Sequence, residues 1–200
     1  MENFDISLKM GSSMIVSGPS GSGKTTFVIQ MINNIGIFDE KPQRVVWCYG
    51  ATPPPFQIGN FKIISKDGLP LEEDLQTLDL VIIDDLMEEG NISQLFTRVA
   101  HHKHCFIVYI TQNLYSKKSR TININTNYLV LFKNPRDQSQ IHHIGRQMFP
   151  GKSQFLIDAF KDATSRAFNC LFIDLKQQTP DKIRVRSSPF NKPINIYLPK

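Results

Sequence analysis

Residues 18–26 of the chain read Gly18-Pro19-Ser20-Gly21-Ser22-Gly23-Lys24-Thr25-Thr26. This stretch fits the pattern G-x-x-x-x-G-K-[ST], in which a glycine-rich loop surrounds phosphate groups with backbone N–H donors. An apolar run at 14–16 precedes it, and a helix-capable stretch from Thr25 to Ile35 follows it, as the motif requires. We therefore expect a nucleotide to bind here, with Lys24 on its β- and γ-phosphates and Thr25 on Mg²⁺.

The composition is typical of a globular intracellular protein. The 200 residues are 40% hydrophobic and 20% charged, and no apolar run approaches the roughly 20 residues that span a membrane. The N-terminus is acidic and has no apolar signal core, and the three scattered cysteines have no metal-ligand spacing. We expect one domain over 1–200, with a core at about 10–175 and a hairpin and extended tail at about 168–200.

Apolar, β-branched runs alternate with helix-like stretches along the chain. Such an alternation is typical of an α/β fold, with a mostly parallel central sheet that helices cover on both faces. The expected strands are Met14–Ser17, Val45–Tyr49, Leu80–Ile83, Phe106–Ile110 and Tyr128–Phe132, with a short addition at Phe61–Ile64. Further helices are expected at Leu71–Leu78, Ile92–Ala100 and Ser153–Arg166. Near the end, Phe168–Leu175 and Ile183–Arg186 flank a turn and predict a C-terminal β-hairpin.

Two acids follow the strand predicted at Leu80–Ile83. Asp84 and Asp85 would lie at the carboxyl edge of the sheet, beside the phosphate loop. Asp84 is expected to hold Mg²⁺ through water, and Asp85 to orient or deprotonate the attacking water. Hydrolases of this kind usually carry Glu at the second position, so Glu88 and Glu89 remain alternatives for the base.

A carboxamide follows the strand predicted at Phe106–Ile110. Gln112 would lie beside the two acids, where it could sense the γ-phosphate or position water, because its side chain both donates and accepts hydrogen bonds. Capping of the strand end is the alternative role.

Four segments in this order make the chain resemble a known family. They are Gly18–Thr26, Val81–Asp85, Tyr109–Asn113 and Leu131–Asp137, the last reading Leu-Phe-Lys-Asn-Pro-Arg-Asp. Together they resemble the poxvirus-type genome-packaging ATPases, most of all those of Polinton and adintovirus-like elements, within the FtsK–HerA superfamily of P-loop NTPases. The resemblance implies an ATP- and Mg²⁺-dependent translocase of double-stranded DNA. It further implies a ring, commonly a hexamer or pentamer, that fills a viral capsid inside the host cell.

Ring ATPases complete each site with an arginine from the neighbouring subunit. The resemblance makes Arg98 the first candidate, because the family carries an arginine in the same segment. Arg120, Arg136 and Arg146 come next, and each of the four could instead contact DNA or pair with a carboxylate.

Basic residues gather in the second half of the chain. Residues 1–115 contain 8 Lys/Arg and 13 Asp/Glu, a net charge of −5, whereas residues 116–200 contain 15 and 5, a net charge of +10. A basic surface of this kind usually binds nucleic acid, and phosphate contacts suffice for a protein that grips any sequence. The DNA-binding candidates are Lys117, Lys118, Arg120, Lys133, Arg136, Arg184 and Arg186, the last two on one face of the expected hairpin.

Two other functions remain open. Guanylate-kinase-like enzymes share the Gly-Pro-Ser-Gly-Ser-Gly-Lys loop and the length, but they do not need paired acids followed by a strand ending in Gln. The second is a nucleotide-gated DNA-binding scaffold that does not hydrolyse ATP. It stays open because Asp85, the expected base, is one methylene shorter than the usual Glu.

Overall fold

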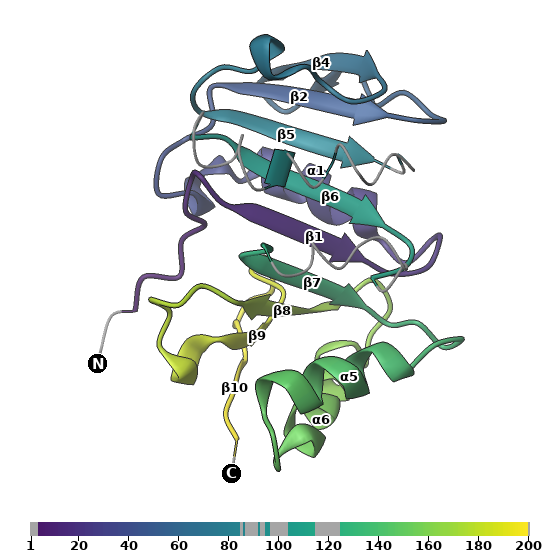
Figure 1. The fold of residues 1–200 in the computed structure, drawn as a ribbon, viewed down its shortest axis with the longest axis vertical. Coiled ribbons are helices and arrows are strands. Elements are labelled where there is room, and N and C mark those ends of the chain that lie inside the picture. The colour runs from purple at the N-terminus through teal and green to yellow at the C-terminus, as the bar shows by residue number, and fades with distance from the viewer. Residues whose placement is uncertain are drawn as a thin grey trace.

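A mixed β-sheet runs through the whole molecule (Figure 1). The computed structural model describes residues 4–84, 86, 92, 95–96, 104–114 and 125–199. These residues form a sheet of ten strands in the order β10-β9-β8-β7-β1-β6-β5-β2-β4-β3. None of their helices is long and apolar enough to cross a membrane.

Six parallel strands form the centre of this sheet. In spatial order they are β7 (Tyr128–Phe132), β1 (Ser13–Ser17), β6 (Phe106–Thr111), β5 (Asp79–Asp84), β2 (Arg44–Tyr49) and β4 (Phe61–Asp67). Every residue of β1 and β7 is buried, as expected of strands covered on both faces. The predicted mostly parallel sheet is therefore confirmed, and β4 is longer than its apolar residues indicate.

Antiparallel strands complete both edges. β3 (Gln57–Ile58) pairs with β4, and β8 (Cys170–Asp174) pairs with β7. β9 (Val185–Ser187) pairs with β8, which confirms the predicted hairpin, and β10 (Ile196–Tyr197) pairs with β9. The second hairpin strand is shorter than predicted, because Asp181–Ile183 forms a 3-10 helix.

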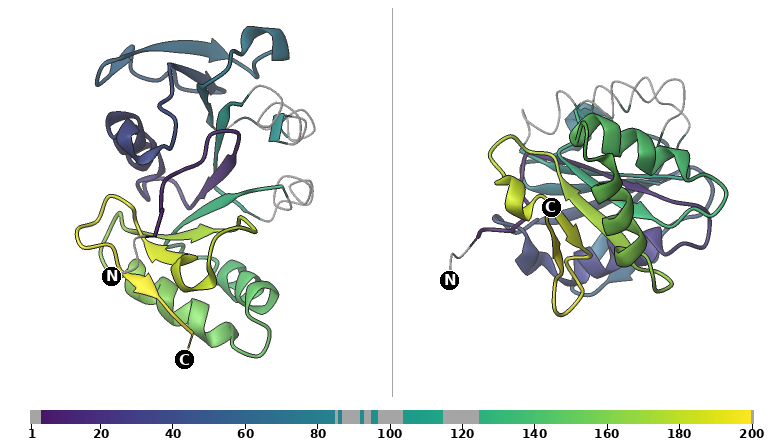
Figure 2. Two further views of the ribbon diagram at one scale, coloured as in Figure 1. Left: turned by 90° about the vertical axis from the view of Figure 1, so that its left-hand side faces the viewer. Right: turned by 90° about the horizontal axis from the view of Figure 1, so that it is seen from below.

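Helices cover both faces of the sheet, and side chains alternate between two cores. Helix α1 (Lys24–Asn33) covers one face, and helices α5 (Ser139–Met148) and α6 (Ser153–Ala163) cover the other (Figure 2). Along β5, Leu80 and Ile82 face the α1 side, whereas Val81 and Ile83 face the opposite core. This period of two follows from the pleat of a strand.

The structure differs from the helix predictions at two places. Leu71–Leu78 is not a helix: only Glu72–Asp74 forms a 3-10 turn, and the Asp74 carboxylate accepts the backbone N–H of Leu71. Helix α5 was not predicted, because its sequence is largely polar and contains Gly145. That glycine is needed for packing, since a Cβ there would lie 2.9 Å from the Ser153 carbonyl oxygen at the start of α6.

Candidate nucleotide-binding site

The carboxyl ends of three neighbouring strands meet at one edge of the sheet. Ser17 at the end of β1 is in register with Thr111 at the end of β6, and Asp84 at the end of β5 is in register with Ile110. The backbone N–H of Gly18 donates to the Thr111 carbonyl at 3.3 Å. Parallel pairing thus brings together segments that lie up to 94 positions apart in the sequence.

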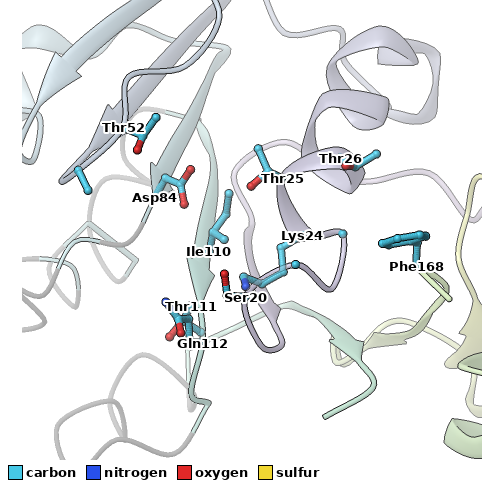
Figure 3. A pocket seen from close by; sticks show the side chains of 13 residues that line it. Ser20, Lys24, Thr25, Thr26, Thr52, Asp84, Ile110, Thr111, Gln112 and Phe168 are labelled. Carbon is cyan, nitrogen blue, oxygen red and sulfur yellow. The ribbon is translucent and has the colours of Figure 1, made fainter. Parts of the chain in front are cut away.

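A cavity of about 440 Å³ opens at this edge (Figure 3). Phosphate-loop residues form one wall, and the tips of β5 and β6 form another. The lining residues are Ser20, Gly21, Gly23, Lys24, Thr25, Thr26, Ala51, Thr52, Asp84, Ile110, Thr111, Gln112 and Phe168. The structure therefore places Lys24, Thr25, Asp84 and Gln112 around one space, as their expected roles on a single nucleotide require.

Two glycines give the phosphate loop its shape. A Cβ at Gly18 would lie 2.6 Å from the Phe132 Cβ, so only glycine fits where the loop leaves β1. Gly23 has a φ of 105° at the start of α1, a conformation that L side chains rarely adopt. The loop can therefore turn tightly and present its backbone N–H groups to an anion at the helix N-terminus.

Lys24 is the first residue of α1, and its ammonium folds back over the loop. Its Nζ donates to the carbonyl oxygens of Gly18, at 2.7 Å, and of Pro19, at 3.0 Å. The Thr25 hydroxyl and the Asp84 carboxylate point toward each other across the cavity (Figure 3). A hydroxyl and a carboxylate in this arrangement suit a magnesium ion, which takes few protein ligands and completes its shell with phosphate and water.

Hydrogen bonds fix the turn after β6. The Thr111 Oγ1 donates to the Asn113 carbonyl at 3.1 Å, and the Asn113 N–H donates back to Oγ1 at 3.3 Å. The exposed Gln112 lies at the apex of this turn and lines the cavity. Gln140 on α5 donates to the Asn113 side chain at 3.4 Å and to Asp137 at 2.8 Å, which connects the turn to the 133–137 segment.

The 133–137 segment is folded around its own polar side chains. The Asn134 Oδ1 accepts the N–H of Arg136, and the Asp137 carboxylate accepts both the N–H and the hydroxyl of Ser139 at the start of α5. Hydrogen bonds from Ser139 and then Gln140 lower the pKa of Asp137. Lys133 and Arg136 are left exposed at the carboxyl edge of β7.

Burial argues against one predicted DNA contact. Arg186 is only 4% exposed, its guanidinium lies 4.9 Å from the Phe172 ring centre, and it is 3.7 Å from the Asp174 carboxylate. Burial lowers the pKa of Arg186. This residue stabilises the hairpin and does not present its charge to a partner.

Arg184 is also engaged within the fold. Its guanidinium donates to the carbonyl oxygens of Asp174, Lys176 and Thr179. Asp174 pairs with Tyr128 at the start of β7, so the Arg184 guanidinium lies at the amino ends of the parallel strands, opposite to the nucleotide cavity.

Several predicted site residues fall outside the described residues: Asp85, Arg98, Lys117, Lys118 and Arg120, together with the alternative acids Glu88 and Glu89. Of the remaining candidates for the arginine in trans, Arg136 and Arg146 are both exposed.

Two parts of the cavity were missed from the sequence. Ala51 and Thr52 lie in the loop after β2, just before three consecutive prolines, and no nucleotide-binding motif includes them. Phe168 lies 145 positions after Gly23 but close to it in space, and no motif surrounds it. Its place in the site follows from the antiparallel return of β8 beside β7.

The strand order, the loop and the cavity together define an α/β fold of the P-loop NTPase type. No family model matches the sequence, and no curated protein sequence matches it. Among solved structures, the chain is similar to the DNA-packaging ATPase from Sulfolobus turreted icosahedral virus, with a TM-score of 0.59 and 11% identity over 96% of this chain and 100% of that one. It is also similar to the genome-packaging NTPase of Sulfolobus turreted icosahedral virus 2 in complex with ATP-gammaS, with a TM-score of 0.55 and 11% identity over 94% and 97% of the two chains. At this identity the likeness establishes the shared fold.

Proposed function

We propose that this protein hydrolyses ATP to move double-stranded DNA into a viral capsid. The observation that carries the proposal is the convergence of Lys24, Thr25, Asp84 and Gln112 on one cavity at the carboxyl edge of the sheet. Two proteins of similar fold, both described as genome-packaging enzymes, support the choice of substrate and partner.

The residues around the cavity would bind phosphate, hold Mg²⁺ and activate water. Backbone N–H groups of the loop and the Lys24 ammonium bind the triphosphate, with Lys24 exchanging the Gly18 and Pro19 carbonyls for phosphate oxygens. Thr25 and Asp84 would hold Mg²⁺, which supplies charge neutralisation at the phosphates when bound. Gln112 orients the attacking water, and Asp85 is proposed to accept its proton.

The protein is proposed to act as a ring of identical subunits, a hexamer or a pentamer, inside the host cell. Each subunit would complete its neighbour's site with an arginine, for which Arg98 is the first candidate, ahead of Arg120, Arg136 and Arg146. The exposed Lys133 and Arg136 are the described residues best placed to contact DNA phosphates near the nucleotide.

The test measures ATP hydrolysis with and without long duplex DNA. We expect DNA to stimulate turnover, and Lys24→Ala and Asp84→Asn to abolish it, while Lys41→Ala, which changes an exposed lysine before β2, leaves it unchanged. Arg98→Ala should abolish turnover yet retain ATP affinity. Phosphate transfer to a nucleoside monophosphate would instead identify a kinase, and binding without any turnover would identify a scaffold.

A further inference from the structure

A phenylalanine at the edge of the cavity has two unusual properties. The Phe168 side chain is 71% exposed, although large aromatic side chains are usually buried. Its backbone has a φ of 65°, a left-handed conformation that is costly for a residue with a bulky side chain. Exposure and strain at one residue indicate a role in binding more than in folding, because neither stabilises the native state.

The backbone around Phe168 is held in place from both sides. Helix α6 ends at Ala163, and the Asn169 N–H donates to the Arg166 carbonyl at 3.3 Å. Cys170, two residues later, is buried and pairs with Phe132 on β7. Since the Phe132 side chain also packs against Gly18, the position of Phe168 is fixed relative to the phosphate loop.

The ring of Phe168 lies against the last glycine of that loop. A Cβ at Gly23 would be 3.3 Å from its Cδ1 atom. Figure 3 shows Asp84, Thr111 and Gln112 on one side of Lys24, and Phe168 on the other, beyond Thr26. A triphosphate whose terminal phosphates face Lys24 and Asp84 can extend its sugar and base toward the Phe168 side.

We propose that Phe168 is the stacking platform for the nucleobase of the bound nucleoside triphosphate. The inference rests on the proposed nucleotide binding and adds where the base lies and how it is held. Stacking on an exposed ring uses the π-face that every base has, so it supplies affinity without choosing between bases. We therefore expect adenine and guanine nucleotides to depend on Phe168 to a similar extent.

The test compares ligands with and without a base. Dissociation constants for Mg-ATP, Mg-GTP and inorganic Mg-tripolyphosphate are measured by calorimetry with the wild type, Phe168→Gly and Phe168→Trp. Glycine tolerates the positive φ, so Phe168→Gly removes the ring without adding strain. Leu198→Ala serves as the control, because Leu198 is a 56% exposed apolar side chain on the C-terminal segment, outside the cavity.

We expect Phe168→Gly to weaken ATP and GTP binding by about 5- to 150-fold, the range that loss of one base–aromatic stack gives, and to leave tripolyphosphate binding within about twofold. Phe168→Trp should keep the affinity, and its indole fluorescence should be quenched by ATP but not by tripolyphosphate. The single native tryptophan, Trp47, is buried and gives a constant background. Leu198→Ala should bind all three ligands normally.

Two results would overturn the inference while leaving nucleotide binding intact. One is unchanged ATP affinity in Phe168→Gly. The other is an equal loss of ATP and tripolyphosphate affinity, since that would mean that the ring only supports the phosphate loop. If the wild type binds neither ligand, the proposed function itself fails and the base site fails with it.

Discussion

Gly18 and Gly23 serve the phosphate loop through different physical effects. Gly18 is required because β7 approaches the loop closely, and Gly23 because the chain turns through a positive φ where α1 begins. Only the first effect depends on tertiary packing, so the motif alone does not show which glycine is limited by space. The distances to Phe132 show that it is Gly18.

Gly18→Ala should therefore damage both the fold and the site. The added Cβ would lie 2.6 Å from the Phe132 Cβ and 2.8 Å from the Ser22 Oγ, and relief of these contacts must move the loop or β7. We expect a loss of about 1–3 kcal/mol in the free energy of unfolding and a clear loss of ATP affinity, measured by urea titration and calorimetry. Gly36→Ala is the matched control, because nothing lies within 4 Å of a Cβ there. A Gly18→Ala protein with wild-type stability and affinity would contradict this account.

At the scale of elements, α5 connects the turn after β6 to the segment after β7. Gln140 contacts both Asn113 and Asp137, and Asp137 accepts hydrogen bonds from Ser139 at the start of the helix. Both segments are among the four on which the resemblance to packaging ATPases rests. The hydrogen bonds of Gln140 hold the turn after β6 and the segment after β7 together beside the cavity, which gives a physical reason why the two segments occur together.

Asp137→Ala should lower stability in a pH-dependent way. Hydrogen bonds from Ser139 and Gln140 lower the pKa of Asp137, so its contribution is fully present above the ordinary carboxyl pKa near 4 and is lost as the pH falls through the lower folded-state value. We expect a loss of about 1 kcal/mol near pH 7, typical of a side chain that accepts a backbone N–H at a helix N-terminus, and a shrinking difference between variant and wild type as the pH falls through the folded-state pKa. Urea unfolding at pH 7 and at several acidic pH values measures it. A difference that grows on acidification would have the wrong sign.

The β8–β9 hairpin depends on a buried charge cluster. Arg186 and Lys176 both lie near the Asp174 carboxylate, at 3.7 Å and 3.6 Å, and Arg186 and Asp174 are almost fully buried. Arg186→Met should cost about 2–3 kcal/mol of unfolding free energy, because Asp174 loses a buried partner, while DNA affinity of the folded protein stays unchanged. Lys182→Met, at an exposed neighbour, is the control for stability. Reduced DNA affinity at full stability would restore Arg186 as a DNA contact.

The sequence predicted the parts of the fold that depend on local pattern. Buried parallel strands appear as apolar runs, and the loop motif marks the start of α1, so β1, β5, β6 and β7 were all located correctly. The three cysteines, which have no metal-ligand spacing, are all buried. The exposure of Arg186 and Phe168 could not be predicted from the sequence, because it depends on how β8 pairs with β7 and β9 in the folded sheet. An alternating Arg-Val-Arg pattern cannot show that the arginine face is covered.

At the scale of the whole molecule, the order of the chain separates charge in space. Elements β7 to β10 and helices α5 and α6 gather at one end of the sheet, so residues 125–199, with 11 Lys/Arg and 5 Asp/Glu, give that end of the described structure a positive charge (Figure 1). Arg184 and Arg186 use part of this positive charge in contacts within the fold, with the Asp174 carbonyl and the Asp174 carboxylate respectively. Lys133 and Arg136 remain exposed at the same edge as the nucleotide cavity, where the proposed movement of DNA would be coupled to the proposed hydrolysis.

Lys133 and Arg136 should then contribute to DNA affinity through phosphates alone. Each lost phosphate contact lowers the slope of log affinity against log salt by about 1, so the double variant Lys133→Gln/Arg136→Gln should lose about 2. The loss should be equal for unrelated duplex sequences, since no base is read. Fluorescence anisotropy of labelled duplexes over a series of KCl concentrations measures the slope. Lys41→Gln, at the opposite edge of the sheet, should leave it unchanged, and an equal effect of both changes would show that only net charge matters.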